Sequence, residues 1–195
     1  MSLVLGLGNP GSRYANTRHN LGWLVVERLV SRWSAAPLET LPVYRAWRAE
    51  VATRTVDLML PLTFMNLSGA AIDVWRSRHA FDPGTFLVVV DDVYLPLGRL
   101  RFRPAGSSGG HRGLESLEAA LEGREWNRLR IGVGAAENAA ELREHVLEEF
   151  TAEEAGAVDA LIGRSADAVE CWCLEGMTQA MNRFNRSEEE EVSES

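Results

Sequence analysis

The feature that most constrains the fold is a set of short apolar runs, each followed by polar residues. The runs are residues 3–5, 55–60 and 86–90, and the last of them reads FLVVV. Runs of this length are typical of buried strands and are too short for buried helices. Residues 21–33, between the first two runs, carry apolar side chains at helical spacing. Strands that alternate with helices predict an α/β fold with a largely parallel central sheet.

The rest of the chain adds elements to the same sheet. Residues 45–60 alternate between polar and apolar positions in two stretches, which predicts a hairpin of antiparallel strands. Thr151 and Glu154 form a capping box that opens a helical region. The further strands are expected at residues 100–103 and 128–133, and the further helices at 66–79, 113–121 and 151–184.

The 195 residues are enough for one well-packed core, and no repeat or linker divides them. We therefore expect a single α/β domain over residues 1–186, with a mixed, mostly parallel twisted sheet flanked by helices. Residues 187–195 contain five Glu, and we expect them to form an acidic, disordered tail.

The charge is distributed unevenly along the chain. The net charge is −8, which by itself argues against a nucleic-acid partner. However, residues 1–136 carry 16 Arg and 12 acidic residues, a net +4, whereas residues 137–195 have a net charge of −12. This asymmetry indicates a basic functional surface formed by residues of the first part of the chain. All 20 basic residues are Arg, so any phosphate contact must come from Arg or from the backbone.

Membrane and metal-binding classes find little support in the sequence. No apolar run approaches 18 residues, and the N-terminus opens directly into a strand-like run, so we expect neither a membrane span nor a signal peptide. Cys171 and Cys173 are too close for a disulfide framework or a zinc pair, which fits a reducing cytoplasm. We expect no metal and no cofactor.

Polar side chains follow each of the three apolar runs. Asn9 follows the first, Phe64 and Asn66 follow the second, and Asp91 follows the third. In open α/β sheets ligands bind at the carboxyl ends of the strands, which meet at one edge. The sequence therefore predicts an active site at this edge, close to the polar stretch 17–20.

Within that stretch, His19 is the candidate general base. Asp91 is the candidate partner that orients the imidazole and supports the charge it gains. Asp91 and Asp92 form an alternative Mg²⁺ pair, but neighbouring strand residues point to opposite faces, which disfavours joint chelation. Ser107 and Ser108 lie in a glycine-rich loop rather than in a nucleophile elbow, so water is the preferred nucleophile.

The glycine motif GLGNPG at residues 6–11 matches the dinucleotide fingerprint G-x-G-x-x-G. Pro10 and the polar residues after it delay the helix, and Glu27 falls in the middle of the helix instead of at the end of a second strand. We interpret the glycines as a tight turn. A nicotinamide or flavin enzyme remains an alternative, which predicts cofactor binding.

A second glycine-rich segment, GSSGGHRG at residues 106–113, precedes a predicted helix. Backbone N–H groups at such a position favour anions. Arginines at strand spacing surround it, and they predict either a charged sheet surface or recognition of a phosphate backbone. These arginines are Arg99, Arg101, Arg103, Arg128 and Arg130.

Taken together, these motifs resemble the bacterial-type peptidyl-tRNA hydrolase family over residues 3–184. The pattern is visible in GLGNPG (6–11), Tyr14, TRHNLG (17–22), TFMNLSG (63–69), DD (91–92), LP (95–96), GGH (109–111) and RLRIG (128–132). The TRHNLG and TFMNLSG blocks are far more specific than the glycine fingerprint. The resemblance implies a phosphorylase/hydrolase-like fold, a cytoplasmic monomer, and hydrolysis of the ester between a peptide and the 3′-terminal ribose of tRNA.

The resemblance also implies roles for individual residues. His19 would activate water and Asp91 would orient it, without a covalent intermediate. Arg103 and Arg130 would bind a tRNA phosphate. The residues implied to bind substrate are Asn9, Tyr14, Phe64, Asn66, His111 and Arg112, among which Asn9 and Asn66 would hold the peptidyl part and the attacked carbonyl, and His111 would close the cleft.

Three departures from the family pattern affect binding rather than catalysis. Arg112 stands where many relatives carry Asn, Tyr94 replaces a frequent Asp, and residues 135–137 (AAE) lack the basic residues often found there. A non-catalytic RNA-binding relative of the same fold is the second hypothesis. The intact His19, Asp91, Asn9 and Asn66 argue against it.

Overall fold

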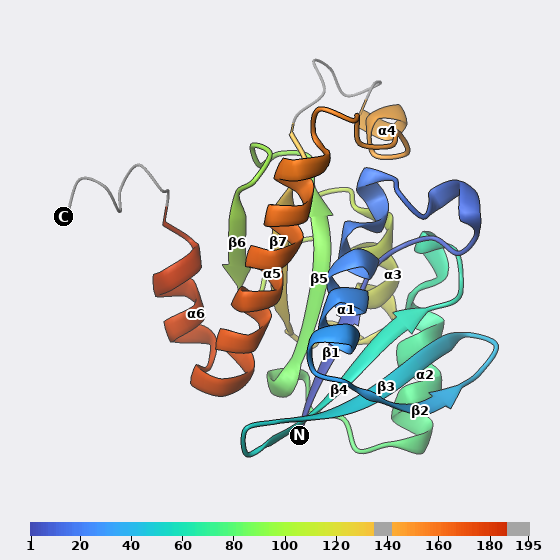
Figure 1. The fold of residues 1–195 in the computed structure, drawn as a ribbon. Coiled ribbons are helices and arrows are strands. Elements are labelled where there is room, and N and C mark those ends of the chain that lie inside the picture. The colour runs from blue at the N-terminus through green and yellow to red at the C-terminus, as the bar shows by residue number, and fades with distance from the viewer. Residues whose placement is uncertain (135–141, 187–195) are drawn as a thin grey trace.

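The computed structural model describes residues 1–134 and 142–186 and contains a twisted seven-stranded sheet (Figure 1). Its strand order is β2-β3-β4-β1-β5-β7-β6. The strands are β1 (Ser2–Gly6), β2 (Ala36–Thr40), β3 (Tyr44–Val51), β4 (Arg54–Pro61), β5 (Phe86–Asp92), β6 (Leu100–Arg103) and β7 (Asn127–Gly132). The four central strands β4, β1, β5 and β7 run parallel, and β2, β3 and β6 are antiparallel to their neighbours. The predicted mixed, mostly parallel sheet is confirmed.

Helices cover both faces of this sheet. The helices in the described residues are α1 (Leu21–Arg32), α2 (Gly69–Arg78), α3 (Arg112–Ala120), α4 (Leu142–His145), α5 (Ala155–Glu175) and α6 (Met177–Phe184), of which all but α4 lie on a face of the sheet. Figure 1 shows α1, α5 and α6 on the near face and α2 and α3 on the far face, and a separate apolar core lies under each group. All seven residues of β5 are buried, because a central strand covered on both faces has no side chain in water.

The structure corrects three expectations about local elements. Strand β2 was not predicted, because this edge strand is half exposed and lacks an apolar alternation. The helix expected over residues 66–79 begins as a 3₁₀ turn, Met65–Leu67, before α2. The expected helical region 151–184 is two helices, which Gly176 separates with φ at +87°, a conformation that favours glycine. The acidic tail and the AAE segment lie outside the described residues.

The first glycine motif brings α1 onto β1. A Cβ atom built on Gly6 would lie 2.2 Å from the carbonyl oxygen of Gly22 in α1. A Cβ atom on Gly22 would lie 2.4 Å from the carbonyl oxygen of Val89 in β5. Both residues must therefore be glycine for the helix to start so close to the sheet. This contact places the residues just before α1, including His19, above the carboxyl ends of β1 and β5.

The parallel register brings the ends of β1, β4 and β5 to the same edge of the sheet. Asn9, the 3₁₀ turn at Met65–Leu67 and Asp91 therefore meet there, as the sequence predicted. Along residues 1–134 and 142–186, no helix combines the length and apolar character needed to cross a membrane.

Candidate active site

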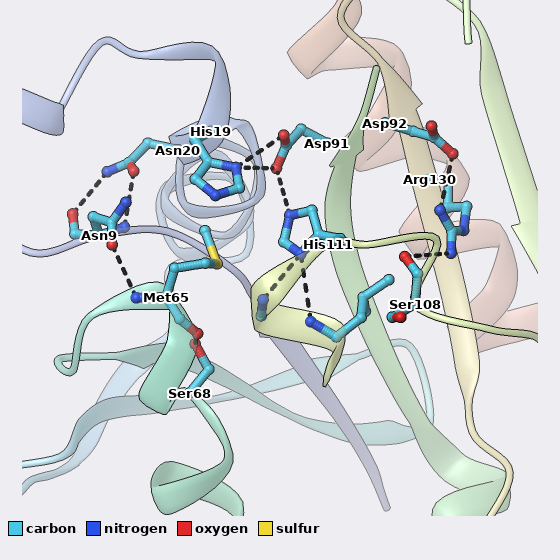
Figure 2. Close-up of polar contacts among 12 residues, drawn as sticks. Asn9, His19, Asn20, Met65, Ser68, Asp91, Asp92, Ser108, His111 and Arg130 are labelled. Atoms are coloured by element: carbon cyan, nitrogen blue, oxygen red, sulfur yellow. Dashed lines mark hydrogen bonds and ion pairs between the residues drawn. The ribbon is translucent and has the colours of Figure 1, made fainter. Parts of the chain in front are cut away.

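A cavity of about 560 Å³ opens at this edge of the sheet. We call it the catalytic cavity; the polar groups at its centre are shown in Figure 2. Nine of the ten predicted site residues line it, the exception being Arg103. They are Asn9, Tyr14, His19, Phe64, Asn66, Asp91, His111, Arg112 and Arg130.

His19 and Asp91 are in direct contact. Nδ1 of His19 lies 2.9 Å from Oδ2 and 3.0 Å from Oδ1 of Asp91. A carboxylate can only accept, so Nδ1 carries the proton of the neutral ring and Nε2 keeps its lone pair. Nε2 forms no hydrogen bond with any residue in the described part of the chain, and the ring lines the catalytic cavity. This is the arrangement that a general base requires.

The two groups shift each other's affinity for protons. Burial alone would lower the pKa of His19, but the charge of Asp91 and the hydrogen bond to it outweigh burial and raise that pKa above 6.5. Burial alone would raise the pKa of Asp91, but the imidazoles of His19 and His111 bring that pKa below its ordinary range. Asp91 is therefore a carboxylate throughout the neutral range, and its side chain is only 1% exposed.

The polar residues around His19 hold its loop in place. The hydroxyl of Thr17 donates to the carbonyl oxygen of Tyr14 (2.9 Å), and the backbone N–H of His19 donates to the carbonyl oxygen of Val146 (2.8 Å). Arg18 is buried and forms two hydrogen bonds with the carboxylate of Glu154, at 2.8 and 3.0 Å. The loop is thus tied to distant segments, so that the imidazole is fixed before substrate binds.

Asn20 and Asn9 form a reciprocal pair. The backbone N–H of Asn9 donates to Oδ1 of Asn20 (2.8 Å), and Nδ2 of Asn20 donates to the backbone carbonyl of Asn9 (3.0 Å). Oδ1 of Asn9 in turn accepts from the backbone N–H of Met65 (2.9 Å). Nδ2 of Asn9 has no hydrogen-bond partner in the part of the chain that the structure describes, and because the bond from Met65 fixes the side-chain amide, Nδ2 is the donor left for a ligand.

The remaining predicted substrate residues lie at the mouth of the cavity. Phe64 is 51% exposed, and Asn66 and Arg112 are also exposed. The side chains of Asn66 and Arg112 form no hydrogen bond or ion pair with the residues that the structure describes. Tyr94, a departure from the family pattern, is 69% exposed and lines the same cavity. These side chains are free to contact a ligand.

His111 occupies a more central position than the sequence indicated. Its Nε2 lies 3.1 Å from Oδ1 of Asp91, so that Asp91 stands between two imidazoles (Figure 2). Its Nδ1 accepts from the backbone N–H groups of Gly113 and Leu114 and caps α3. No local pattern signals this double role, because histidine is not a preferred capping residue.

His19, Asp91 and His111 also have the spacing of a metal site, with one ligand atom from each within 4.8 Å of the others. Their nitrogen–oxygen distances of 2.9 to 3.1 Å are those of hydrogen bonds. A cation at this place would have to displace the proton on each imidazole that bonds Asp91. Hydrogen bonds alone explain why these three potential metal ligands lie so close together.

A second cavity of about 380 Å³ adjoins the first, and we call it the arginine cavity. The two cavities share Asp92, Gly109 and Arg130. Arg101 lies opposite Arg130, and Arg103 lies opposite Arg128, in the antiparallel β6–β7 pair. These four arginines therefore share one face of the sheet, as strand spacing predicted.

The four arginines differ in their surroundings. Arg101 and Arg103 are exposed, and their guanidinium groups have no partner among the described residues. Arg130 is paired with Asp92 (3.0 Å) and donates to the carbonyl oxygen of Ser107 (2.7 Å), which ties down the glycine-rich loop. Arg128 is 2% exposed, and its guanidinium carbon lies 4.1 Å from the centroid of the Trp126 ring.

Asp91 and Asp92 serve different partners, because neighbouring strand residues point to opposite sides. Asp91 faces the two histidines and Asp92 faces Arg130. The same alternation disfavours joint chelation of a cation, and the structure confirms that the two carboxylates diverge. The contact of His19 with Val146 and that of Arg18 with Glu154 were not predicted, since nothing local links positions more than 100 residues apart.

Comparison with known proteins places the chain in one family. The family model described as peptidyl-tRNA hydrolase matches residues 3–192. The chain is 41% identical to the peptidyl-tRNA hydrolase of Methylacidiphilum infernorum, over 94% of this chain and 97% of that protein. It is 42% identical to that of Symbiobacterium thermophilum, over 94% of this chain and 98% of that protein.

Solved structures give the same result. The crystal structure of peptidyl-tRNA hydrolase from Acinetobacter baumannii superposes with a TM-score of 0.87 at 33% identity, over 95% of this chain and 94% of that one. Sequence and fold therefore agree over nearly the whole chain. The chain belongs to the peptidyl-tRNA hydrolase family.

Proposed function

We propose that this chain hydrolyses the ester bond between a peptide and the 3′-terminal ribose of tRNA, and so releases tRNA from peptidyl-tRNA left by abortive translation. The observation that carries the proposal is the contact between His19 and Asp91 at 2.9 Å, beside a cavity that Asn9 and Asn66 also line. Membership of the family, whose relatives are named peptidyl-tRNA hydrolases, supports the choice of substrate.

In the proposed reaction His19 is the general base. Nε2 takes a proton from a water molecule while the water oxygen attacks the carbonyl carbon of the ester. Asp91 keeps the imidazole in the required tautomer and stabilises the imidazolium that forms. When the tetrahedral intermediate collapses, the bond to the ribose oxygen breaks, and that oxygen receives the proton. The products are a free peptide and tRNA, with no covalent intermediate.

Asn9 supplies the stabilisation of the developing oxyanion. Its amide is held by the Met65 backbone N–H, and Nδ2 has no partner among the residues that the structure describes, so the donor needs no rearrangement when charge develops. Asn66 binds the peptidyl part at the mouth of the cavity, together with Tyr14, Phe64 and Arg112. An ester needs less assistance to its leaving group than an amide, so a base with amide donors is sufficient.

The arginine cavity binds a phosphate of the acceptor end of tRNA. It adjoins the catalytic cavity, and Arg103 offers a guanidinium with no partner in the described residues. Arg130 is already paired with Asp92, which partly neutralises its charge. Arg103 therefore contributes the larger share of phosphate binding. A tRNA bound in this way has its 3′ ester at His19 and a phosphate at Arg103.

The proposed enzyme is a cytoplasmic monomer that uses neither a metal nor a cofactor. The two cysteines are buried as free thiols, in keeping with a reducing compartment. The acid–base chemistry proposed for His19, Asp91 and Asn9 requires neither a metal ion nor an organic cofactor. Size-exclusion chromatography with light scattering tests the monomer, and activity after exhaustive dialysis against a chelator tests the independence from metal.

The decisive experiment measures release of the acyl group from N-acetyl-aminoacyl-tRNA by the wild-type protein and by His19→Ala. We expect turnover by the wild type and a loss of at least about 10³-fold in the variant, because the general base is removed. A matched control is His79→Ala, which removes a histidine distant from the cavity. If purified wild type binds tRNA without turnover, the chain is instead a non-catalytic RNA-binding relative.

A further inference from the structure

His111 is the side chain that joins the base–carboxylate pair to α3. It lies just before the helix, with its side chain 11% exposed, and both of its ring nitrogens are engaged. Nδ1 faces the backbone N–H groups of Gly113 (3.1 Å) and Leu114 (3.4 Å), and Nε2 faces Oδ1 of Asp91 (3.1 Å). Its ring centroid is 4.8 Å from that of His19.

These partners fix the tautomer of His111. A backbone N–H can only donate, so Nδ1 must hold a lone pair, and the proton of the neutral ring must be on Nε2. Nε2–H then donates to Asp91. His111 thus uses one nitrogen in the manner of an N-cap oxygen, on the second and third residues of α3, and the other nitrogen as a donor to the carboxylate.

The carboxylate of Asp91 therefore accepts hydrogen bonds from two imidazoles, those of His19 and His111. Nδ1 of His19 lies 2.9 Å from Oδ2 and 3.0 Å from Oδ1, and Nε2 of His111 lies 3.1 Å from Oδ1, so that the two imidazoles share Oδ1 of one carboxylate. Asp91 is buried, and its negative charge would otherwise act on His19 alone. A carboxylate with a second donor attracts a neighbouring imidazolium less strongly.

We propose that His111 is a positioning residue, which caps α3 and donates to Asp91, and which thereby limits how tightly the carboxylate holds a protonated His19. The inference rests on the proposed function, in which His19 must lose its proton before it can act as a base. Without His111, a larger fraction of His19 would be protonated and inactive at neutral pH.

The other charged or titratable groups around the catalytic cavity lie at its mouth or are paired away from His19. Asp92 is paired with Arg130 and faces away from Asp91, and Arg112, Tyr14 and Tyr94 lie around the mouth. The segment after α4 contacts His19 through the carbonyl oxygen of Val146, which carries no formal charge. Of the groups in this cavity, Asp91 and His111 are therefore the ones expected to set the basicity of His19.

Two substitutions separate the two roles of His111. In His111→Asn, the side-chain oxygen takes the place of Nδ1 and keeps the cap, but the amide does not reach Asp91. In His111→Gln, the side chain is one carbon longer, so that its amide reaches Asp91 while the cap is lost. His79→Asn is the matched control, because His79 pairs with Glu39 away from the catalytic cavity.

The first measurement is the pH dependence of kcat/KM on N-acetyl-aminoacyl-tRNA. We expect the acidic limb of His111→Asn to move to higher pH by about 0.5 to 1 unit, the effect of one hydrogen bond on the protonation of His19. His111→Gln is expected to keep the wild-type limb and to unfold at a lower temperature. His79→Asn should leave the limb in place.

The second measurement is an NMR titration of the His19 ring in the absence of substrate, with the chain's four histidines assigned by substitution. The pKa of His19 should rise in His111→Asn and remain unchanged in His111→Gln. An unchanged His19 titration in His111→Asn overturns the proposal, as do equal shifts in the two variants. Since the titration needs no turnover, an inactive wild type with the expected NMR shift contradicts the proposed function and leaves this inference standing.

Discussion

The catalytic cavity and the arginine cavity adjoin each other and are built in opposite ways. In the catalytic cavity His19, Asp91, His111 and Asn9 each have at least one hydrogen bond to a fixed partner. In the arginine cavity Arg101 and Arg103 extend from β6 without a partner in the described residues. The reacting groups of the catalytic cavity are thus held by hydrogen bonds before a ligand arrives, whereas the arginine cavity offers two long side chains without such bonds to the described residues.

The difference follows from what each cavity has to do. A general base must hold its nitrogen within hydrogen-bond distance of one water, and small displacements cost much of the rate. A phosphate is attracted over several ångströms, and a flexible guanidinium can adjust to it. We therefore expect substitutions in the catalytic cavity to act on kcat and those in the arginine cavity to act on KM.

The largest effect is expected for Asp91→Asn. The amide cannot stabilise an imidazolium, and its NH₂ group can present a donor to Nδ1 of His19, which favours the wrong tautomer. We expect kcat on N-acetyl-aminoacyl-tRNA to fall by about 10³-fold. Asp82→Asn, at an exposed turn distant from the cavity, is the control. A loss of less than tenfold would show that Asp91 does not orient the base.

The next effect is expected for Asn9→Ala, which removes the fixed donor to the oxyanion. We expect kcat to fall by about 10²-fold with little change in KM, because the donor acts mainly in the transition state. Asn182→Ala, an exposed position on α6, is the matched control. If KM rises and kcat is retained, Asn9 binds the ground state and the oxyanion donor lies elsewhere.

A smaller effect is expected for Arg103→Ala in the arginine cavity. KM for the tRNA substrate should rise by about tenfold, and the salt dependence of binding should lose about one phosphate contact. KM for a minimal acyl-nucleotide ester without that phosphate should not change. Arg124→Ala, which removes an exposed arginine outside both cavities, is the control. Equal changes with both substrates would contradict a phosphate site.

The smallest effect is expected from pH, and it should act on the two cavities differently. The pKa of His19 lies above 6.5, because the charge of Asp91 and the hydrogen bond to it outweigh burial. Since the base acts in its neutral form, kcat should fall several-fold as pH drops from about 8 to 6.5. KM for tRNA should stay constant, because guanidinium groups remain protonated over this range. If KM for tRNA changed with pH in parallel with kcat, the two cavities would not respond to pH differently.

The same raised pKa has a consequence for stability. A histidine with a higher pKa in the folded protein stabilises the fold when protonated, so its contribution is complete below the pKa of the unfolded chain. That contribution is lost as pH rises through the folded value. His19 therefore works as a base in the pH range where its ion pair with Asp91 no longer adds to the free energy of unfolding.

Much of the fold could be predicted from local patterns. Short apolar runs identified β1, β4 and β5, and helical spacing identified α1, because these patterns report directly which side chains are buried. The edge strand β2 has no such pattern, since one strand edge and much of its surface face water. The break at Gly176 was missed because apolar spacing continues on both sides of it.

The sequence by itself determined that Asn9, Asn66 and Asp91 meet at one edge, because parallel strands must end on the same side of a sheet, and that His19 follows the first of these strands. Only the tertiary structure decided which hydrogen bonds they form. The cap that fixes the tautomer of His111, the pairing of Asn20 with Asn9, and the clamp from Glu154 on Arg18 depend on the distance and direction of individual atoms. Those depend on how the segments pack, and residue type alone does not encode them.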